Sequence, residues 1–155
     1  MVATALDSSE TILVTNVYAP IDIRGKIHLW DHIRYVRSYS PYFPWILGGD
    51  FNSILSLEEK RGGWARLGPA SNLFQAQVYV LFVIDVKPSN GVFTWNNRWS
   101  GQEAILECLD RFLVSFYWVG SGLIISSKII DWRGSNHWLI KFSSSLVALP
   151  KNPSF

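Results

Sequence analysis

The sequence predicts a layered α/β domain whose strands pair mostly antiparallel. The first observation is the order of its periodic segments, β-β-α-β-α-β-β-β-β, which ends in a run of strands. The second is composition: 48% of the residues are hydrophobic, 17% are charged and eight are tryptophan, as is typical of a sheet-rich globular protein. The chain has 155 residues, which fits one domain. We predict that this domain covers residues 1–142 and that residues 143–155 form a tail.

The N-terminal segments predict a hairpin followed by a helix. Residues 3–6 and 12–18 are apolar and flank a polar turn. Pro20 ends the second strand, because proline cannot donate to a continuing ladder. Asp22 can cap the next helix. Apolar residues recur every three positions on one face of this helix (Ile27, Trp30, Ile33 and Val36), and we expect the basic residues on its surface (Lys26, Arg34 and Arg37).

The central segments predict a buried strand, a surface loop and a second helix. Two prolines, Pro41 and Pro44, close the first helix and lead into a strand over residues 45–50. Residues 56–69 are polar and contain glycines, so we expect a surface loop. A helix is predicted over residues 70–83, with one apolar side made of Phe74, Val78 and Leu81.

The C-terminal half predicts strands only. The Asn-Gly pair at residues 90–91 indicates a turn. Apolar, β-branched and aromatic segments around and after it predict four strands, over residues 92–95, 109–115, 123–130 and 137–142.

Composition excludes several classes of protein. The formal charge of +2 is too small to indicate a nucleic-acid partner by itself. Cys108 is the only cysteine, so neither a disulfide framework nor a thiolate zinc site is expected. The first ten residues lack the pattern of a signal peptide, and the longest apolar run, over residues 78–84, is too short to span a bilayer. We therefore expect an intracellular protein, nuclear or cytoplasmic, that is not secreted and has no membrane partner.

Polar residues gather at the ends of the predicted strands. They are Tyr18, Asp50, Asn52, Asp110, Asn136 and His137. Carboxylates, an imidazole, a carboxamide and a phenol can together hydrolyse a phosphodiester. In such a site a divalent ion polarises the phosphoryl oxygen, a carboxylate activates water and hydrogen-bond donors stabilise the developing charge. An oxygen-rich ligand set favours Mg²⁺ or Mn²⁺ over Zn²⁺.

Each of these residues also has a purely structural interpretation. Gly, Asp and Asn within residues 48–52 are usual turn residues. Tyr18 could be a half-buried residue of a sheet with a solvated hydroxyl. Asp110 could form a surface ion pair with Arg111, and His137 could be a structural histidine with satisfied hydrogen bonds.

Six motifs, in their order along the chain, resemble those of the endonuclease/exonuclease/phosphatase family. They are NVYAP (16–20), WILGGDFN (45–52), EKRGG (59–63), GVFTWNN (91–97), LDRFLVS (109–115) and SNHW (135–138). They are most similar to the endonuclease domain of plant LINE-type (non-LTR) retrotransposons, and the resemblance covers residues 11–140. It implies a DNase I-like four-layer α/β sandwich, present here in part, a DNA substrate and Mg²⁺, with Mn²⁺ as the alternative.

The resemblance also implies a role for each site residue. Tyr18 would hydrogen-bond the scissile phosphate, and Asn52 would position it. Asp50 would orient or deprotonate the attacking water. Asp110 would orient His137, which would donate to the phosphoryl oxygen; an aspartate partner fixes the tautomer of such a histidine.

Three departures from the family pattern bear on activity. The chain begins after the family's early asparagine and metal-binding glutamate, so we interpret it as N-terminally truncated. Asn136 stands where the family has an aspartate at the metal, which leaves Asp50 and the neutral Asn136 as the expected ligands. Cys108 stands where arginine is common. We therefore predict a degenerate fragment of a retrotransposon endonuclease domain, with little or no activity.

Two alternatives stay open, together with one weaker possibility. The chain could be an active Mg²⁺-dependent hydrolase of the endonuclease or phosphatase type. It could also be a remnant that binds nucleic acid weakly through the basic residues Lys60, Arg61 and Arg66. The tryptophan count alone would suit a carbohydrate-binding module. Strands missing from the sandwich would leave an apolar sheet face exposed, so self-association is also expected.

Overall fold

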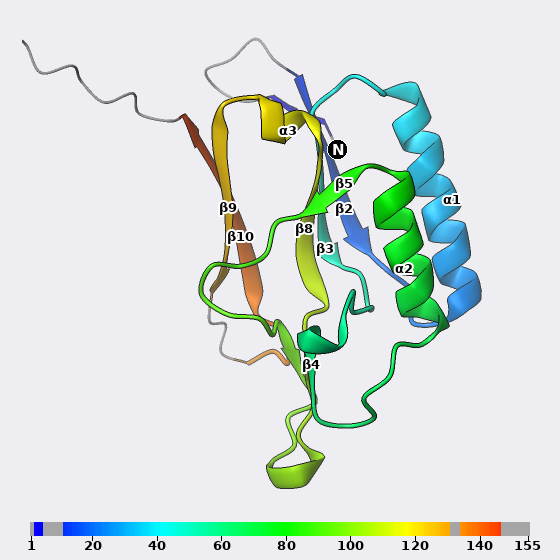
Figure 1. Cartoon of the computed structure of the whole chain (residues 1–155), viewed down its shortest axis with the longest axis vertical. Coiled ribbons are helices and arrows are strands. Elements are labelled where there is room, and N and C mark those ends of the chain that lie inside the picture. The colour runs from blue at the N-terminus through cyan, green and yellow to red at the C-terminus, as the bar shows by residue number, and fades with distance from the viewer. Residues whose placement is uncertain (1, 5–10, 131–133, 147–155) are drawn as a thin grey trace, which may run out of the picture.

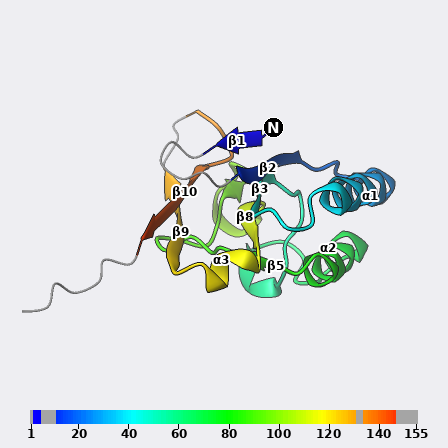
Figure 2. The same ribbon diagram turned by 90° about the horizontal axis from the view of Figure 1, so that it is seen from above.

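The computed structural model of the chain describes residues 2–4, 11–130 and 134–146. Its elements form three layers (Figure 1). The middle layer is a sheet with the order β1 (Val2–Thr4), β2 (Thr11–Tyr18), β3 (Trp45–Asp50), β8 (Asp110–Ser115) and β5 (Val83–Asp85). Helices α1 (Ile23–Tyr39) and α2 (Pro69–Val80) cover one face of this sheet, and the antiparallel pair β9 (Leu123–Ile130) and β10 (Leu139–Leu146) lies on the other side (Figure 2).

The pairing within the central sheet is mostly antiparallel. Only β2 and β3 run parallel among the described strands, and α1 makes the crossover between them. Smaller elements lie beyond the ends of β3 and β8. They are the three-stranded sheet β4 (Lys60–Arg61), β7 (Leu106–Glu107) and β6 (Trp95–Asn96), the 3₁₀ turns η1 (Leu57–Glu59) and η2 (Gly101–Glu103), and the short helix α3 (Tyr117–Gly120).

Alternation along β3 divides the core between the two faces of the central sheet. Trp45 and Leu47 are fully buried and belong to the cluster under the helices. Ile46 belongs to the second cluster, with Val114 and Trp118, on the side of β9 and β10. Because successive side chains of a strand point to opposite faces, Asp50 follows Ile46 onto the side away from the helices.

An aromatic stack forms the centre of the helix-side core. The rings of Trp30 and Phe51 lie 5.9 Å apart, and Phe74 stacks on both, at 5.5 Å and 5.0 Å. Trp30 comes from α1, Phe74 from α2 and Phe51 from the residue directly after β3. This packing anchors the C-terminal end of β3, where Asp50 lies.

The two glycines of β3 are required by close contacts. A Cβ at Gly48 would lie 2.5 Å from the ring of Phe112 on β8. Gly49 has φ +137°, a conformation that favours glycine, and a Cβ there would lie 2.0 Å from the carbonyl oxygen of Val17. The Gly-Gly pair thus lets β3 pack closely against both of its neighbours.

The predicted helices are present, but two residues of α1 differ from expectation. Asp22 caps α1, as predicted, through its Oδ1, which accepts from the Gly25 N–H at 2.8 Å. Lys26 was expected on the surface and is instead 1% exposed, whereas Ile27 of the predicted apolar face is 46% exposed. The buried face is spaced at i, i+4 and i+7, with Lys26, Trp30 and Ile33, because the true helical period exceeds the three-residue repeat seen in the sequence.

Other predicted boundaries needed correction. Helix α2 ends at Val80, and residues 83–85 pair with β8 as a strand instead of continuing the helix. The predicted loop over 56–69 contains η1 and β4, and its Glu59 is buried. Of the strand predicted over 92–95, only Trp95 lies in β6.

Strand predictions near the termini hold with shifts. Strand β9 has the predicted bounds, and β8 begins one residue later than predicted. The last strand begins at Leu139 instead of residue 137 and continues through Leu146, four residues into the predicted tail. The first predicted strand is observed as Val2–Thr4; residues 5–6 of that prediction and residues 147–155 of the tail lie outside the described residues. Within the described part of the chain, no helix is long and apolar enough to cross a membrane.

Candidate active site

Three of the predicted site residues share one row across the central sheet. Tyr18 on β2 is the register partner of Asp50 on β3, and Asp50 is the partner of Asp110 on β8. Register partners on neighbouring strands point to the same face, so all three lie on the side away from the helices. Their environments differ: Asp50 is 8% exposed and Tyr18 is 82% exposed.

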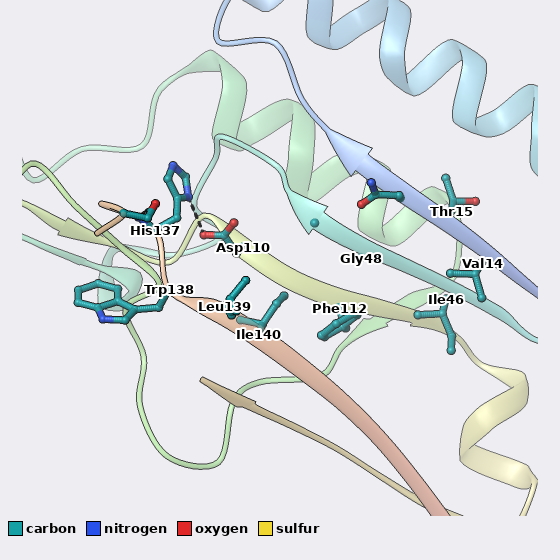
Figure 3. A pocket seen from close by; sticks show the side chains of 13 residues that line it. Val14, Thr15, Ile46, Gly48, Asp110, Phe112, His137, Trp138, Leu139 and Ile140 are labelled. Atoms are coloured by element: carbon teal, nitrogen blue, oxygen red, sulfur yellow. Dashed lines mark hydrogen bonds and ion pairs between the residues drawn. The ribbon is translucent and has the colours of Figure 1, made fainter. Parts of the chain in front are cut away.

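His137 reaches this row from the segment before β10. Its Nδ1 lies 3.0 Å from Oδ2 of Asp110 (Figure 3). Backbone contacts hold the segment against the region around β6, since the Trp138 N–H donates to the Thr94 carbonyl at 2.8 Å and His137 is bridged to Trp95. The Trp95 ring also meets the imidazole edge-on, with centroids 6.5 Å apart. His137 is therefore held by Asp110 on one side and by the backbone and ring contacts from Thr94 and Trp95 on the other.

The structure brings Asp50, Asp110 and His137 together. One ligand atom from each lies within 4.8 Å of the others, a grouping that could hold a metal ion. Burial raises the pKa of the Asp50 carboxyl, although the hydrogen bond from the Asn52 backbone opposes the rise. A divalent cation at this position would favour the ionised carboxylate, so binding and ionisation of Asp50 are linked.

Asn52 lies in a strained turn next to Asp50. Its φ is +46°, and its backbone N–H donates to Asp50 Oδ1 at 2.8 Å. The Asn52 side-chain nitrogen donates to the Ala19 carbonyl at 2.8 Å, which ties the turn to the segment after β2. With Nδ2 engaged in this way, the amide group is held in one orientation at the end of β3.

Lys26 holds the same turn from beneath, a role that the sequence did not suggest. Its Nζ donates to the Phe51 and Asn52 carbonyls, each at 2.9 Å. Burial lowers the pKa of the Lys26 amino group to about 8, against the opposing charges of Asp50 and Asp22. The signal that could have found it is its spacing, four residues before the buried Trp30 on the same helix face.

Thr94 and Arg111 fix the start of β8, where Asp110 lies. The Oγ1 of the fully buried Thr94 accepts from the Leu109 and Asp110 N–H groups, at 3.0 and 2.8 Å. Arg111 does not form the surface ion pair with Asp110 considered from the sequence, because consecutive residues of a strand face opposite sides. It is buried and pairs with Glu59 at 2.8 Å and with Asp85 at 3.0 Å.

The remaining predicted residues lie around this centre. The carbonyl of Asn136 accepts from the Asn96 N–H at 2.9 Å, and its side chain is half-buried. Lys60 pairs with Glu107 and lines a small cavity with Asn52 and Arg66. Arg61 lies over the Phe93 ring, 5.3 Å from its centre, and thus packs on a neighbouring loop.

A larger cavity of about 440 Å³ extends from the site between the central sheet and β10 (Figure 3). Asp110 and His137 lie at one end of it. Apolar side chains form much of the remaining wall: Val14, Ile46, Phe112, Leu139 and Ile140. The polar row therefore borders an apolar space inside the layered fold.

Comparison with known proteins identifies the fold. No family model matches the sequence, and no curated protein matches it. The endonuclease domain of TRAS1, a telomere-specific non-LTR retrotransposon, is similar in structure, with a TM-score of 0.67 and 15% identity over 88% of this chain and 56% of that one. An endonuclease/exonuclease/phosphatase family protein from Bacteroides thetaiotaomicron has a TM-score of 0.55 and 16% identity over 90% of this chain and 52% of that one.

A mannosyl-6-phosphatase from Bacteroides thetaiotaomicron VPI-5482 is similar to the same degree, with a TM-score of 0.55, 16% identity and coverage of 90% of this chain and 53% of that one. The chain thus spans little more than half the length of these solved structures. The mixed α/β fold of the chain, with its antiparallel sheets and flanking helices, is the fold of the DNase I-like endonuclease/exonuclease/phosphatase proteins.

Proposed function

We propose that the chain is a degenerate fragment of a Mg²⁺-dependent, phosphodiester-cleaving endonuclease domain of a LINE-type retrotransposon, with little or no activity on its own. One observation supports this most. Among the described His, Cys, Asp and Glu residues, the cluster at the site is Asp50, Asp110 and His137, and the side chain of Asp110 pairs with His137. Because Asp110 shares its Oδ2 with His137, Asp50 would be the main carboxylate ligand of a metal at this cluster.

The proposed mechanism assigns proton transfer to the pair of Asp110 and His137. The carboxylate accepts from Nδ1, which orients the ring and would stabilise its protonated form, and the Nε2–H of this imidazolium would donate to a phosphoryl oxygen. Asp50 would orient or deprotonate the attacking water. Tyr18 and Asn52, which flank Asp50 in space, would hold the scissile phosphate through the phenol and the amide.

The metal site is the weak part of this arrangement. Asp50 and Asn136 would hold Mg²⁺, or Mn²⁺, and the bound ion would supply Lewis-acid stabilisation of the phosphoryl oxygen. Hard cations prefer charged oxygen ligands, and a neutral amide provides much less Coulombic attraction than a carboxylate. We therefore expect low affinity for the ion and, as a consequence, little cleavage.

A second candidate function is weak binding of nucleic acid without cleavage. Trp64, at 82% exposed, carries Arg66 over its ring, 5.8 Å from the centre, in the same segment as Lys60 and Arg61. Exposed aromatic rings beside cations can stack on bases and contact phosphates. DNA is the partner that suits both candidate functions. Cleavage or binding of DNA would require a location inside the cell.

The third proposal is an active hydrolase, and the compactness of the cluster favours it. Ligand atoms within 4.8 Å of one another are close enough for one ion after small adjustments of the side chains. Cleavage would then need Asp50 and His137 together.

We also propose that the chain associates with itself. The strand β1 pairs with residues 11–13 of β2, and no described strand pairs with the same edge of β2 over residues 14–18. The neighbouring cavity has apolar walls, so a second copy that covered it would bury apolar surface.

Nicking of supercoiled plasmid tests the activity. The purified chain would be assayed in Mg²⁺ and in Mn²⁺ beside Asp50→Ala and His137→Ala, with Asp31→Ala as a control for an exposed carboxylate on α1. We expect no variant to exceed background. Metal-dependent nicking by the wild type and Asp31→Ala, abolished in both site variants, would overturn the inactive-fragment proposal in favour of the enzyme.

A further inference from the structure

A second, smaller cavity of about 150 Å³ adjoins the turn at Asn52. Its wall combines residues from four segments: the turn after β3, the basic segment that contains Lys60 and Arg66, the first turn of α2, and residues 107–109, from the end of β7 to just before β8. The polar residues that line it are Asn52, Ser53, Lys60, Arg66, Ser71 and Glu107. Of these residues, only Asn52 also belongs to the candidate active site, and Asp50, Asp110 and His137 do not line the cavity, so the two sites are distinct.

The N-terminus of α2 opens onto this cavity. Gly68 is the N-cap and provides no side-chain hydrogen bond, and the first turn of the twelve-residue helix contains no acidic residue. Ala70 and Ser71, in that first turn, both line the cavity. The first backbone N–H groups of a helix lack partners within the helix and carry partial positive charge, which favours an anion.

Ser53 provides an independent indication of a ligand. The residue is 6% exposed, and its Oγ has no hydrogen-bond partner among the described residues. A buried hydroxyl without a partner is unfavourable, so its position in the wall of a polar cavity points to a partner that enters the cavity. A ligand with oxygen acceptors would satisfy the hydroxyl.

The charges around the cavity also favour an anion. Lys60 and Arg66 line it, and Glu107 pairs with Lys60, so the carboxylate offsets one of the two cations. Among the described residues no carboxylate pairs with Arg66, whose guanidinium lies over the Trp64 ring. A cation held by an aromatic ring keeps its N–H donors free for a planar or tetrahedral anion.

From these features we propose that the cavity is a phosphate subsite, which binds a backbone phosphate of a nucleic-acid strand beside the phosphate at Asn52. The inference that the phosphate belongs to a nucleic acid rests on the proposed function. Ser53 directly follows Asn52, so the turn after β3 would contact both phosphates. The subsite would position the strand without taking part in the cleavage.

Ser71→Asp is the variant that separates this role from a structural one. Ser71 is the third residue of α2, where a carboxylate stabilises a helix through its dipole and free N–H groups. The same carboxylate would occupy and repel a phosphate site. Ala76→Glu is the matched control, because it adds the same charge at an exposed position on the same helix.

The measurement is binding of a fluorescent DNA duplex by anisotropy across a salt series, with EDTA present to prevent cleavage. Ser71 is 6% exposed, so the melting temperature of Ser71→Asp is measured first to establish that the variant is folded. We expect the folded variant to bind several-fold more weakly and its salt slope to fall by about 0.9, the value for one lost phosphate contact. Arg66→Gln, a change at an exposed side chain, should weaken binding in the same way without affecting the fold. Ala76→Glu should bind like the wild type.

Inorganic phosphate distinguishes the two sources of the ligand. If the site takes free phosphate, the wild type will melt at a higher temperature in phosphate than in chloride at equal ionic strength, and Ser71→Asp will not. If the variants weaken DNA binding and inorganic phosphate does not raise the melting temperature of the wild type, the ligand is a phosphate of the nucleic acid. Equal affinity and salt slope in Ser71→Asp and Ala76→Glu, or no response in either arm, would overturn the subsite. Plasmid nicking reports on the proposed function separately, because neither arm requires cleavage.

Discussion

Lys26 Nζ donates to the carbonyl of Asn52 at 2.9 Å, so an amino group from α1 holds the turn that follows the end of β3. The same nitrogen binds the Phe51 carbonyl, and the residue is 1% exposed. Helix α1 and the turn at the candidate site are thereby joined by a buried polar contact, whose energy depends on the protonation of one amine.

Lys26→Met should remove a rise of stability with pH. The Lys26 pKa is about 8 in the folded chain and 10.5 as its ordinary value, so between these pH values the unfolded chain binds more protons than the native one. The free energy of unfolding therefore rises from pH 8 to 10.5 and is flat for this group below pH 8. Urea unfolding at both pH values gives the rise in the free energy of unfolding for the wild type and for the variant. The difference between the two rises belongs to Lys26, because other titrating groups such as the Cys108 thiol contribute equally to both proteins. An equal rise in both proteins would contradict the assignment.

Asp110→Ala should release the imidazole of His137. Because Asp110 Oδ2 lies 3.0 Å from Nδ1, we expect the neutral ring of the wild type to carry its proton on Nδ1. Nitrogen-15 NMR of the histidine rings reports the tautomer directly. In the variant the proton should redistribute toward Nε2, while the exposed His28 and His32 on α1 keep their wild-type spectra. An unchanged His137 signal would show that Asp110 does not orient the ring.

Glu59→Gln should destabilise the chain strongly. Both carboxylate oxygens of Glu59 accept from Arg111, which is buried and also pairs with Asp85. Removing one charge from a buried pair costs about 3–5 kcal/mol, whereas loss of an exposed pair costs roughly 1 kcal/mol or less. Asp31→Ala, which breaks the exposed pair with Arg34, is the control. Urea midpoints that fall equally in the two variants would refute a special role for the Arg111 network.

Leu139→Asn should reduce dye binding and self-association. Leu139 is 49% exposed and lines the larger cavity, so its replacement removes apolar surface at little cost to folding. We expect the wild type to bind a hydrophobic dye and to sediment as a concentration-dependent mixture, and we expect both effects to weaken in the variant. Ile124→Asn changes an exposed apolar residue on β9 outside the cavity wall and serves as the control. A wild-type monomer without dye binding would exclude self-association through this surface.

Asn136→Asp should strengthen metal binding. The substitution adds a carboxylate to the proposed ligand pair with Asp50. Changing only the hydrogen-bond partners of metal ligands shifts affinity by roughly 10–100-fold, so we expect a gain of at least this order from a new charged ligand. Mn²⁺ binding followed by its paramagnetic signal should show this gain, and Asp50→Asn should abolish binding in either background. We expect no nicking from Asn136→Asp alone. Equal Mn²⁺ affinity with and without the substitution would remove Asn136 from the site.

The positions of the catalytic candidates could be predicted because local sequence determines strand ends. Gly48 and Gly49 mark where β3 packs against its neighbours, and the motifs around Asp50 and Asp110 follow apolar strands. Alternation along each strand implies on which face Asp50 and Asp110 lie. The register between β3 and β8 then brings the two carboxylates into one row, and this register is a property of the folded sheet. Local patterns were therefore sufficient for the strand ends and the faces of these residues.

Contacts between distant segments could not be predicted in the same way. The sequence around Lys26 predicts a surface residue. Its partners in the structure are the carbonyls of Phe51 and Asn52, which lie 25 and 26 residues further along the chain. The ion pair of Arg111 joins residues 52 positions apart, and sequence proximity suggested Asp110 instead. In both cases the partner is set by tertiary packing, which overrides the tendency of charged residues to be exposed.

The row of Tyr18, Asp50 and Asp110 also limits which changes in chain length the site can tolerate. An insertion or deletion of one residue within β3 would turn Asp50 toward α1 and α2, whereas a change of two residues would restore its direction. The motif GGDFN would read the same in both cases. In related sequences, an odd change in the number of β3 residues would therefore remove Asp50 from the site even where the GGDFN motif is unchanged, whereas an even change would not.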